Sequence, residues 1–366
     1  MASQIKPKAQ HAPPDAVVLG LGQMGLVCAG LLHTASQMPN PDVPAWARRG
    51  FRVAMWGHDE AEAANLAQTR RSERLPGFVL PGPVSVAMRD EQIEGASFII
   101  SAVPVQHMRE AWERLAPKIG PDVGVVSVAK GVEEGTLLRP TQVIADVLRS
   151  TRRDDPDGKP RPIAALSGPT IAAELARCLP AAMIAAGDDA EFIRHVQAVV
   201  GNSWMRVYTN SDVLGVELAG AIKNVVAIAA GICDGLQAGY NAKSALLARG
   251  LAEIVRLGTA MGASPQTFFG ISGVGDLATT CFSPEGRNRS CGEALGRGRR
   301  LEEYIAGSPH VVEGVATTRA VMELARKYRV EMPIVAAVNA VLFEGLDPIA
   351  AIGQLMSREQ KPERVG

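Results

Sequence analysis

Short apolar runs rich in β-branched residues alternate with amphipathic segments throughout the first half of the chain. The runs predict strands at Ala16–Leu19, Arg52–Trp56, Phe98–Val103 and Val123–Val128. The segments that follow them predict helices at Met24–Leu32, Asp59–Arg70, Val105–Leu115 and Leu137–Arg149. Strands that alternate with helices imply right-handed crossovers and a mostly parallel sheet with both faces covered.

The second half of the chain has a different pattern. A charged, proline-rich surface loop is expected at Ser150–Pro162, followed by two short strands at Ile163–Leu166 and Ala181–Ala186. From Asp212 onward the apolar spacing is helical almost throughout, and in one such helix Glu253 is expected on the solvated face with neighbouring arginines. The pattern therefore predicts an α/β domain over residues 15–210 and an all-helical domain over residues 211–360.

Composition and charge exclude several classes of protein. The 366 residues include 38 Lys and Arg and 38 Asp and Glu, so the chain has no net field to attract nucleic acid or an anionic membrane. An apolar content of 47% excludes wholesale disorder. The longest apolar stretch, Val213–Cys233, contains Glu217 and Lys223, which favours a buried helix over a membrane span.

Cysteine and histidine usage points to a reduced compartment without a metal site. The five cysteines form no C-x-x-C, and the polar segment Met1–Pro14 does not resemble a secretory leader, so we expect a cytoplasmic protein. None of the six histidines has zinc-protease spacing, and no Cys/His cluster offers metal ligands.

A glycine motif follows the first strand and opens a helix. Gly20, Gly22 and Gly25 form a G-x-G-x-x-G with Gln23 and Met24 inside it. Such a turn lets a pyrophosphate approach bare backbone N–H groups at a helix N-terminus. In this context the motif predicts a Rossmann-like, doubly wound dinucleotide-binding domain, and a purely structural turn is the alternative.

The cofactor that this motif would bind is less clearly defined. A site for NAD usually ends its second strand with a carboxylate for the ribose hydroxyls. Here the strand ends in Met55-Trp56-Gly57-His58, and Asp59 comes late enough to be a helix N-cap instead. This leaves room for a 2′-phosphate facing His58 and favours acceptance of NADPH. The proline-rich segment Ser36–Gly50 is expected to be a surface excursion.

Candidate substrate-binding residues follow the later strands. Lys130 comes at the end of a strand, where open α/β sheets bind ligands, although a solvated lysine is an alternative. The segment Ser167–Thr170 follows the next strand and is expected to point backbone N–H groups and a hydroxyl into the same crevice.

Lys223 is the most informative residue, because a lysine inside an apolar helix is costly to bury unless it is paired or used. Desolvation lowers the pKa of a lysine and makes it a proton donor and acceptor near neutrality. The alternative is a structural pair with Glu217. Further along, Asp276 in a glycine-rich turn offers a carboxylate to orient the ammonium. Arg287 offers a guanidinium suited to a phosphate, although by itself its segment is more often an ordinary basic loop.

These residues resemble the NAD(P)-dependent glycerol-3-phosphate dehydrogenases of the soluble, bacterial type, from about Val17 to Lys361. The resemblance is carried by ten short motifs: Leu75-Pro76-Gly77, Ser167–Thr170, Gly215-Val216-Glu217, Ala221–Asn224, Asp234-Gly235, Asn241-Ala242-Lys243, Arg249-Gly250-Leu251, Gly273–Leu277, Arg287-Asn288-Arg289 and Val312-Glu313-Gly314. It implies a Rossmann-like domain followed by a helical, 6-phosphogluconate-dehydrogenase-like domain.

The resemblance also implies a reaction and a set of site residues. The reaction is the reversible reduction of dihydroxyacetone phosphate to sn-glycerol 3-phosphate by NADH or NADPH, which supplies glycerophospholipid synthesis, and a homodimer is implied. The implied catalytic residues are Lys223, Asp276 and Lys130. Implied substrate contacts are Lys130, Gly168, Thr170, Lys223, Asp276, Gly286, Arg287 and Asn288. Implied cofactor contacts are Gly20, Gly22, Gln23, Met24, Gly25, His58, Lys130, Ala172, Arg287, Val311 and Glu313.

Two other functions remain as alternatives. The pair Gln23-Met24 departs from the family's usual glycine loop and is similar to that of the β-hydroxyacid dehydrogenases, which would take a carboxylate substrate. A non-catalytic dinucleotide sensor would keep the glycine turn but has little reason to keep a lysine inside an apolar helix.

Overall fold

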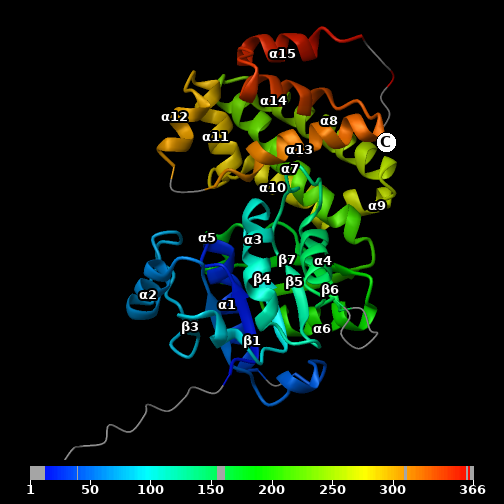
Figure 1. Cartoon of the computed structure of the whole chain (residues 1–366). Helices are drawn as coiled ribbons and strands as arrows, with labels where there is room; N and C mark the ends of the chain where they lie inside the picture. The colour runs from blue at the N-terminus through cyan, green and yellow to red at the C-terminus, as the bar shows by residue number, and fades with distance from the viewer. Residues whose placement is uncertain (1–12, 39, 155–160, 309–310, 360–361, 363–366) are drawn as a thin grey trace, which may run out of the picture.

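The computed structural model describes residues 13–38, 40–154, 161–308, 311–359 and 362. Two predicted segments lie partly outside these residues. They are the first twelve positions of the polar segment Met1–Pro14 and residues 155–160 of the predicted surface loop. The sheet forms one end of the molecule and the helices from α7 onward form the other (Figure 1).

One eight-stranded sheet forms the first domain. Its strands are β1 (Ala16–Leu19), β2 (Val53–Trp56), β3 (Ser85–Ala87), β4 (Phe98–Ser101), β5 (Gly124–Ser127), β6 (Ile163–Ser167), β7 (Ala181–Gly187) and β8 (Met205–Asn210). Their spatial order is β3-β2-β1-β4-β5-β6-β7-β8, and all neighbours are parallel except β6 and β7. The predicted mostly parallel sheet is confirmed, whereas β3 and β8 were not predicted.

The order of the strands places a crevice beside β1. The chain runs outward from β1 to β2 and β3 on one side, and β4 begins the other side, so the loops after β1 and β4 diverge at this point. Ligands in doubly wound sheets bind at such a switch point, outside the carboxyl ends of the strands. The glycine motif follows β1 directly.

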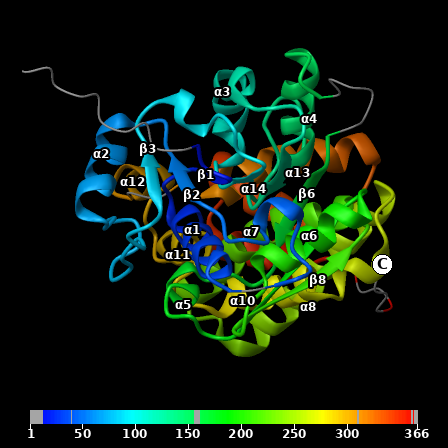
Figure 2. The ribbon, with the colours of Figure 1, turned by 90° about the horizontal axis from the view of Figure 1, so that it is seen from below.

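Helices cover both faces of the sheet, as Figure 2 shows from below. They are α1 (Gln23–Ser36), α2 (Glu60–Thr69), α3 (Val105–Leu115), α4 (Pro140–Ser150), α5 (Ala172–Leu175) and α6 (Ala190–Val200). Side chains of α1 and α6 share one apolar core with the sheet, and those of α3 and α4 share another. All four residues of β1 are fully buried, because helices pack against the strand on both sides.

The segment Ser36–Gly50 is more than the surface excursion that its composition predicts. It contains the short helix η1 (Ala45–Ala47), and both Val43 and Ala47 are buried. The Trp46 ring stacks on Phe98 at 5.8 Å between centroids, so the segment closes the end of the core that contains α1 and α6.

The helical domain is built around α7. Its elements are α7 (Val213–Gly235), α8 (Gly239–Ala260), α9 (Pro265–Phe268), the π-helical turn η4 (Ile271–Gly275), α10 (Asp276–Phe282), α11 (Arg287–Gly296), α12 (Leu301–Ala306), α13 (Glu313–Tyr328), α14 (Pro333–Phe343) and α15 (Pro348–Met356). Among the described residues, α7 alone is long and apolar enough to cross a membrane, but 83% of its most apolar window is buried inside the protein. It is the core helix that the sequence predicts.

Glycines bring α7 and α11 into close contact. A Cβ on Gly231 would lie 1.9 Å from the Arg289 carbonyl oxygen, and one on Gly292 would lie 1.9 Å from the Ile228 carbonyl oxygen. No larger residue fits at either position without separating the helices. This contact fixes the start of α11, which carries Arg287, beside the middle of α7, which carries Lys223.

The expectation that Glu253 is solvated was wrong. Its side chain is buried at 3% exposure, and its carboxylate accepts hydrogen bonds from the backbone N–H groups of Ile334 and Val335 at 2.7 and 3.3 Å. These groups belong to the first turn of α14 and lack partners within that helix. Glu253 therefore caps the N-terminus of α14 instead of facing solvent.

Candidate functional site

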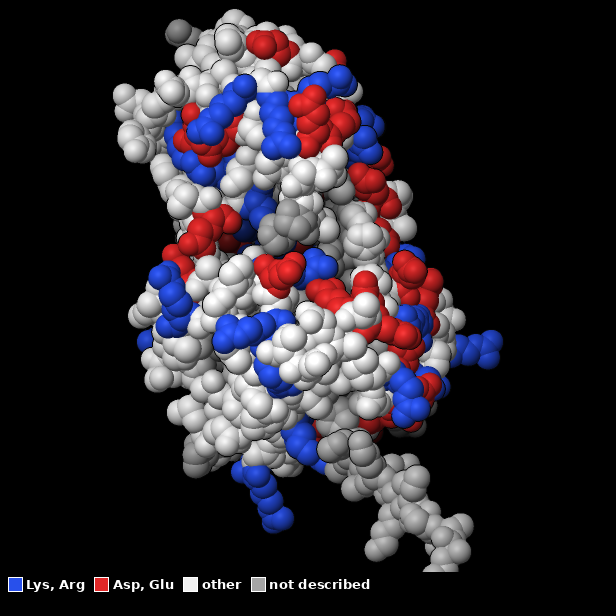
Figure 3. Space-filling model, turned by 90° about the vertical axis from the view of Figure 1, so that its left-hand side faces the viewer, with Lys and Arg blue, Asp and Glu red and all other residues white. Residues whose placement is uncertain are grey.

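A cavity of about 690 Å³ lies between the sheet and the helical domain. The loops after β1, β2, β4, β5 and β6 line it from one side, and α7, α10, α11 and the start of α13 line it from the other. Among the residues predicted to form the site, all except Gly25 and Gly168 line this cavity. Acidic and basic side chains are interspersed on the face that Figure 3 shows, including the waist between the two domains.

The three glycines of the turn have different roles. Gly20 has φ +111°, and a Cβ there would lie 2.9 Å from the Ala102 carbonyl oxygen. A Cβ on Gly25 would lie 2.0 Å from the Gly20 carbonyl oxygen. Gly22 differs, because a Cβ there would meet no protein atom within 4 Å. Gly20 and Gly25 therefore serve the turn itself, and Gly22 leaves space toward the cavity at the start of α1, which fits a pyrophosphate.

Two lysines share one carboxylate at the boundary between the domains. Nζ of Lys130 lies 2.6 Å from Oδ2 of Asp276, and Nζ of Lys223 lies 2.8 Å from Oδ1. Lys130 also donates to the carbonyl oxygen of Gly168 at 2.9 Å, and Lys223 donates to the hydroxyl of Thr280. Asp276 is 1% exposed and Lys223 is 6% exposed, so three charged groups lie in a largely dry environment.

This environment changes the proton affinity of Lys130. Burial lowers the pKa of Lys130 from 10.5 to about 8, an effect that Asp276 opposes and Lys223 reinforces. A lysine with such a pKa exchanges a proton readily near neutral pH.

The alternative in which Lys223 pairs with Glu217 was wrong. The Glu217 carboxylate instead accepts hydrogen bonds from the backbone N–H and hydroxyl of Thr141 at 2.8 and 2.7 Å, and it pairs with Arg139. Arg139 and Thr141 lie at the start of α4, so Glu217 joins α7 to the sheet domain. Lys223 lies further along α7, toward the cavity.

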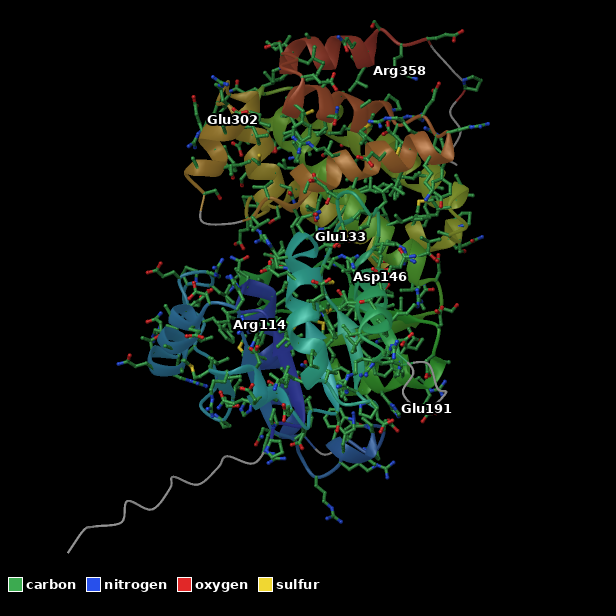
Figure 4. The ribbon with its side chains drawn as sticks, in the orientation of Figure 1. Arg114, Glu133, Asp146, Glu191, Glu302 and Arg358 are labelled. Carbon is green, nitrogen blue, oxygen red and sulfur yellow. The ribbon has the colours of Figure 1, made fainter. Side chains whose placement is uncertain are left out.

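A second link holds the loop that carries Lys130. Arg109 on α3 pairs with Glu133 at 2.9 Å and with Asp146 on α4 at 2.7 Å. Figure 4 labels both carboxylates where the sheet domain meets the helices. Because Glu133 lies three residues after Lys130, these bonds limit the movement of the loop.

Arg287 and Asn288 open α11 at the wall of the cavity. The Asn288 side chain is buried, and its oxygen accepts a hydrogen bond from the backbone N–H of Gly314 at 2.8 Å. Arg287 makes no ion pair with any residue that the structure describes, although it lines the cavity. An unpaired guanidinium at a helix N-terminus is suited to an anion such as a phosphate.

The end of β2 places His58 at the cavity and gives Asp59 a structural role. The Asp59 carboxylate accepts a hydrogen bond from the Glu62 backbone N–H at 2.9 Å and caps α2, as one of the two sequence interpretations has it. The backbone N–H of Glu62 lowers the pKa of Asp59, and the charges of His58 and Arg74 lower it further. Asp59 does not line the cavity.

Several residues that line the cavity were not predicted from the sequence. The buried Asn224, with no hydrogen-bond partner for its side-chain nitrogen among the described residues, lies next to Lys223. Thr280, one helical turn after Asp276, contacts Lys223. The i,i+4 spacing of Thr280 from Asp276 is a signal that could have found Thr280. At the other end of the cavity, Glu62 and Arg74 had no such signal.

No group of three or more His, Cys, Asp or Glu residues in the described part of the chain could hold a metal ion. The charged cluster contains two lysines and a single carboxylate. That set is not suited to a cation, because ammonium groups cannot act as ligands.

Comparison with known families gives two matches that together cover most of the chain. Residues 15–193 match the N-terminal domain model of NAD-dependent glycerol-3-phosphate dehydrogenase, and residues 212–353 match its C-terminal domain model. The first match ends within α6, and the second begins at the residue before α7.

Individual proteins agree with these matches. The chain is 42% identical over 355 residues to a glycerol-3-phosphate dehydrogenase (NAD(P)+) of Streptomyces griseus, covering 96% of this chain and 99% of the relative. It is 44% identical over 319 residues to one from Salinibacter ruber, covering 87% and 92%. The crystal structure of glycerol-3-phosphate dehydrogenase from Coxiella burnetii superposes with a TM-score of 0.84 at 32% identity, covering 94% of this chain and 99% of that one.

Proposed function

This chain belongs to the family of NAD-dependent glycerol-3-phosphate dehydrogenases and is an NAD(P)-dependent oxidoreductase, and from that premise we propose that it reversibly reduces dihydroxyacetone phosphate to sn-glycerol 3-phosphate, with Lys223 as the proton donor and acceptor. The observation that carries this assignment is the pair of lysines on Asp276 beside the glycine turn. NADH or NADPH, when bound at Gly22, supplies the reducing equivalents.

The lysines supply the electrostatics and the proton. Negative charge develops on the C2 oxygen of the substrate as its carbonyl is reduced, and a preorganised ammonium stabilises that charge most where water is excluded. Lys223 then donates a proton to the oxygen, and the reverse reaction returns it. Asp276 holds both ammonium groups in position, and Lys130 lies beside substrate and nicotinamide.

Substrate binding is assigned to the opposite wall of the cavity. The Arg287 guanidinium binds the phosphate, together with Asn288 and the backbone at Gly286. Gly168 and Thr170 contact the substrate from the sheet side, since Lys130 already lies within hydrogen-bond distance of both. An anchored phosphate fixes the reacting carbon in the cavity and thereby lowers the entropic barrier.

The remaining cofactor contacts are assigned by their positions around the cavity. They are Gly20, Gln23, Met24, His58, Ala172, Val311 and Glu313, with Gly25 acting through the turn. The enzyme is proposed to be a cytoplasmic homodimer that supplies glycerophospholipid synthesis, as the family resemblance implies. Light scattering of the purified chain tests the oligomeric state.

The decisive experiment compares two substrates and two cofactors on one plate. Dihydroxyacetone phosphate is expected to drive oxidation of NADH or NADPH, and unphosphorylated dihydroxyacetone is expected to do so at least ~100-fold less efficiently, since a charge-assisted bidentate contact contributes about 3 kcal/mol. Equal rates with the two substrates would exclude a phosphate site at Arg287. If only a 3-oxo acid drove the oxidation of NADH or NADPH, the result would instead support a β-hydroxyacid dehydrogenase.

A further inference from the structure

The part of the cavity nearest α2 contains polar side chains that take no part in the chemical step. His58 follows β2, Glu62 lies in the first turn of α2, and Arg74 lies in the loop after α2. The Arg74 guanidinium donates to both oxygens of the Glu62 carboxylate, from Nε at 2.5 Å and from Nη2 at 3.2 Å. All three side chains line the cavity together with the glycine turn.

The position of Arg74 is fixed by its own backbone. The side-chain nitrogen of Gln23, inside the glycine turn, donates to the Arg74 carbonyl oxygen at 2.7 Å. The next residue, Leu75, is buried in the core at 2% exposure. The Arg74 loop is therefore held against the glycine turn.

An imidazole and a guanidinium therefore lie where a dinucleotide fold presents its adenosine ribose. In such folds the residue after the second strand lies beside the ribose 2′ position, and a nearby arginine accommodates a 2′-phosphate. Asp59 caps α2 and does not line the cavity. Glu62 is a carboxylate that does line this end of the cavity, and it is paired with Arg74.

Another arginine at this end of the cavity is already committed. Arg114 on α3 donates two hydrogen bonds to Asp90, at 2.7 and 2.9 Å, and its guanidinium lies over the Trp56 ring at 5.3 Å. Figure 4 labels Arg114 on the side of the sheet domain that faces α2. By contrast, Nη1 of Arg74 donates to no described residue, and the Arg74 side chain is 43% exposed.

We propose that Arg74 and His58 form a binding site for the 2′-phosphate of NADPH and that Glu62 competes with that phosphate for Arg74, so that the chain accepts both cofactors. With NADPH, Arg74 donates to the phosphate through the N–H groups that Glu62 does not use. With NADH, the Glu62 carboxylate accepts from the ribose hydroxyls, and Arg74 keeps it oriented. This inference rests on the proposed use of NAD(P) and adds the residues that set the preference.

The test compares two variants with a matched control by equilibrium titration of NADPH and NADH fluorescence. In Arg74→Gln, the Kd for NADPH is expected to rise about tenfold relative to that for NADH, the fold-change of one charge-assisted hydrogen bond. In Glu62→Gln, which removes the competing charge, the preference is expected to shift about threefold or more toward NADPH. Arg71→Gln, an exposed arginine of the same loop outside the cavity, is expected to leave the ratio unchanged.

Salt provides a second readout. Raising the ionic strength is expected to weaken NADPH binding more than NADH binding in the unmodified chain, and this difference is expected to shrink in Arg74→Gln. A ratio that neither variant moves by more than twofold would overturn the inference. Equal losses for both cofactors in Arg74→Gln would also overturn it, since they would indicate contact with a part that the two cofactors share.

The outcomes separate this inference from the proposed function. If neither cofactor bound to the unmodified chain, the proposed use of NAD(P) would fail. If both bound and the ratio stayed constant across the variants, only the assignment of Arg74 and Glu62 would fail.

Discussion

Replacing Asp276 by asparagine keeps the shape of the side chain and removes the charge that two lysines share. The carboxylate oxygens lie 2.6 and 2.8 Å from the Lys130 and Lys223 nitrogens. In the variant both ammonium groups lose their counter-charge, and the asparagine NH₂ group points a donor at one of them. The charged form of the lysines is then strongly disfavoured in the dry cluster.

The size of the effect follows from the pKa of Lys130, which burial already lowers from 10.5 to about 8. A neighbouring opposite charge typically changes a pKa by ~2 units, so the loss of the Asp276 charge is expected to lower the pKa of Lys130 by about that amount. At pH 7 roughly a tenth of Lys130 would remain charged, compared with about nine-tenths in the unmodified chain. We therefore expect kcat/KM for the reduction of dihydroxyacetone phosphate to fall at least ~10-fold at this pH.

The pH profile of kcat/KM is the assay that isolates this effect. Activity in the reductive direction is expected to fall as the pH rises through about 8, the pKa of Lys130, in the unmodified chain, and roughly two pH units lower in Asp276→Asn. Lowering the pH should thus recover part of the variant's activity.

Stability supplies an independent measurement. A lowered lysine pKa means that the unfolded chain binds more protons, so stability rises with pH above the folded-state pKa. This rise begins near pH 8 in the unmodified chain and near pH 6 in the variant. The stability deficit of the variant, about 3–5 kcal/mol at pH 6, is expected to narrow by about 2.7 kcal/mol by pH 8 in urea unfolding.

Asp234→Asn is the matched control. Asp234 also bridges two cations, with Lys243 at 2.7 Å and Arg289 at 2.6 Å, but it lies outside the cavity. Its replacement is expected to lower stability without moving the pH at which activity is lost. The reasoning would be refuted if Asp276→Asn still lost activity near pH 8, or if Asp234→Asn shifted the pH at which activity is lost by the same amount.

Three further predictions concern other parts of the molecule. Lys223→Met is expected to lose turnover by at least ~100-fold while its Kd for NADH, measured by fluorescence, stays within about twofold; near-full turnover would remove Lys223 from proton transfer. Gly22→Ala is expected to keep the melting temperature of the unmodified chain but to bind NADH at least ~10-fold more weakly. Gly25→Ala is expected to unfold at a lower temperature, because its Cβ would lie 2.0 Å from the Gly20 carbonyl oxygen. The reverse pattern would contradict the roles assigned to the two glycines. Burial raises the pKa of Glu253 from 4.5 to about 7, so between these two pH values the folded chain binds a proton that the unfolded chain does not. Glu253 therefore makes the free energy of unfolding fall as the pH rises from about 4.5 to 7. Urea unfolding of Glu253→Gln should show a flatter dependence of stability on pH over this range, and an unchanged dependence would exclude the effect.

Most of the sheet could be predicted because its strands carry their own signal. β1 is a continuous apolar run and β5 has two adjacent valines, and both strands are buried along their whole length, which is the pattern of a central parallel strand. β3 is three residues long with an exposed first residue, and β8 has exposed positions along its length, so neither has an apolar run to detect. Their strand conformation comes from pairing with β2 and β7.

The site was predictable where a residue type is improbable in its local sequence. Lys223 stands out because it interrupts an apolar helix, and the glycine turn stands out because of its spacing. The partner of Lys223 could not be chosen from the helix alone, since Glu217 and Asp276 are both plausible until the fold places Glu217 against Arg139. Arg74 is an ordinary loop arginine in the sequence, and only the cavity distinguishes it from Arg71.

The path of α7 restricts how the enzyme can open. Its first turns are bonded to the start of α4 through Glu217, and its later turns are in contact with α11 through glycines. A domain motion that separated α7 from the start of α4 would have to break the hydrogen bonds of the buried Glu217 carboxylate, which is costly. Substrate entry and product release therefore fall to the shorter segments around the cavity, and turnover in this chain is expected to be gated by loop motion at one side of a rigid frame.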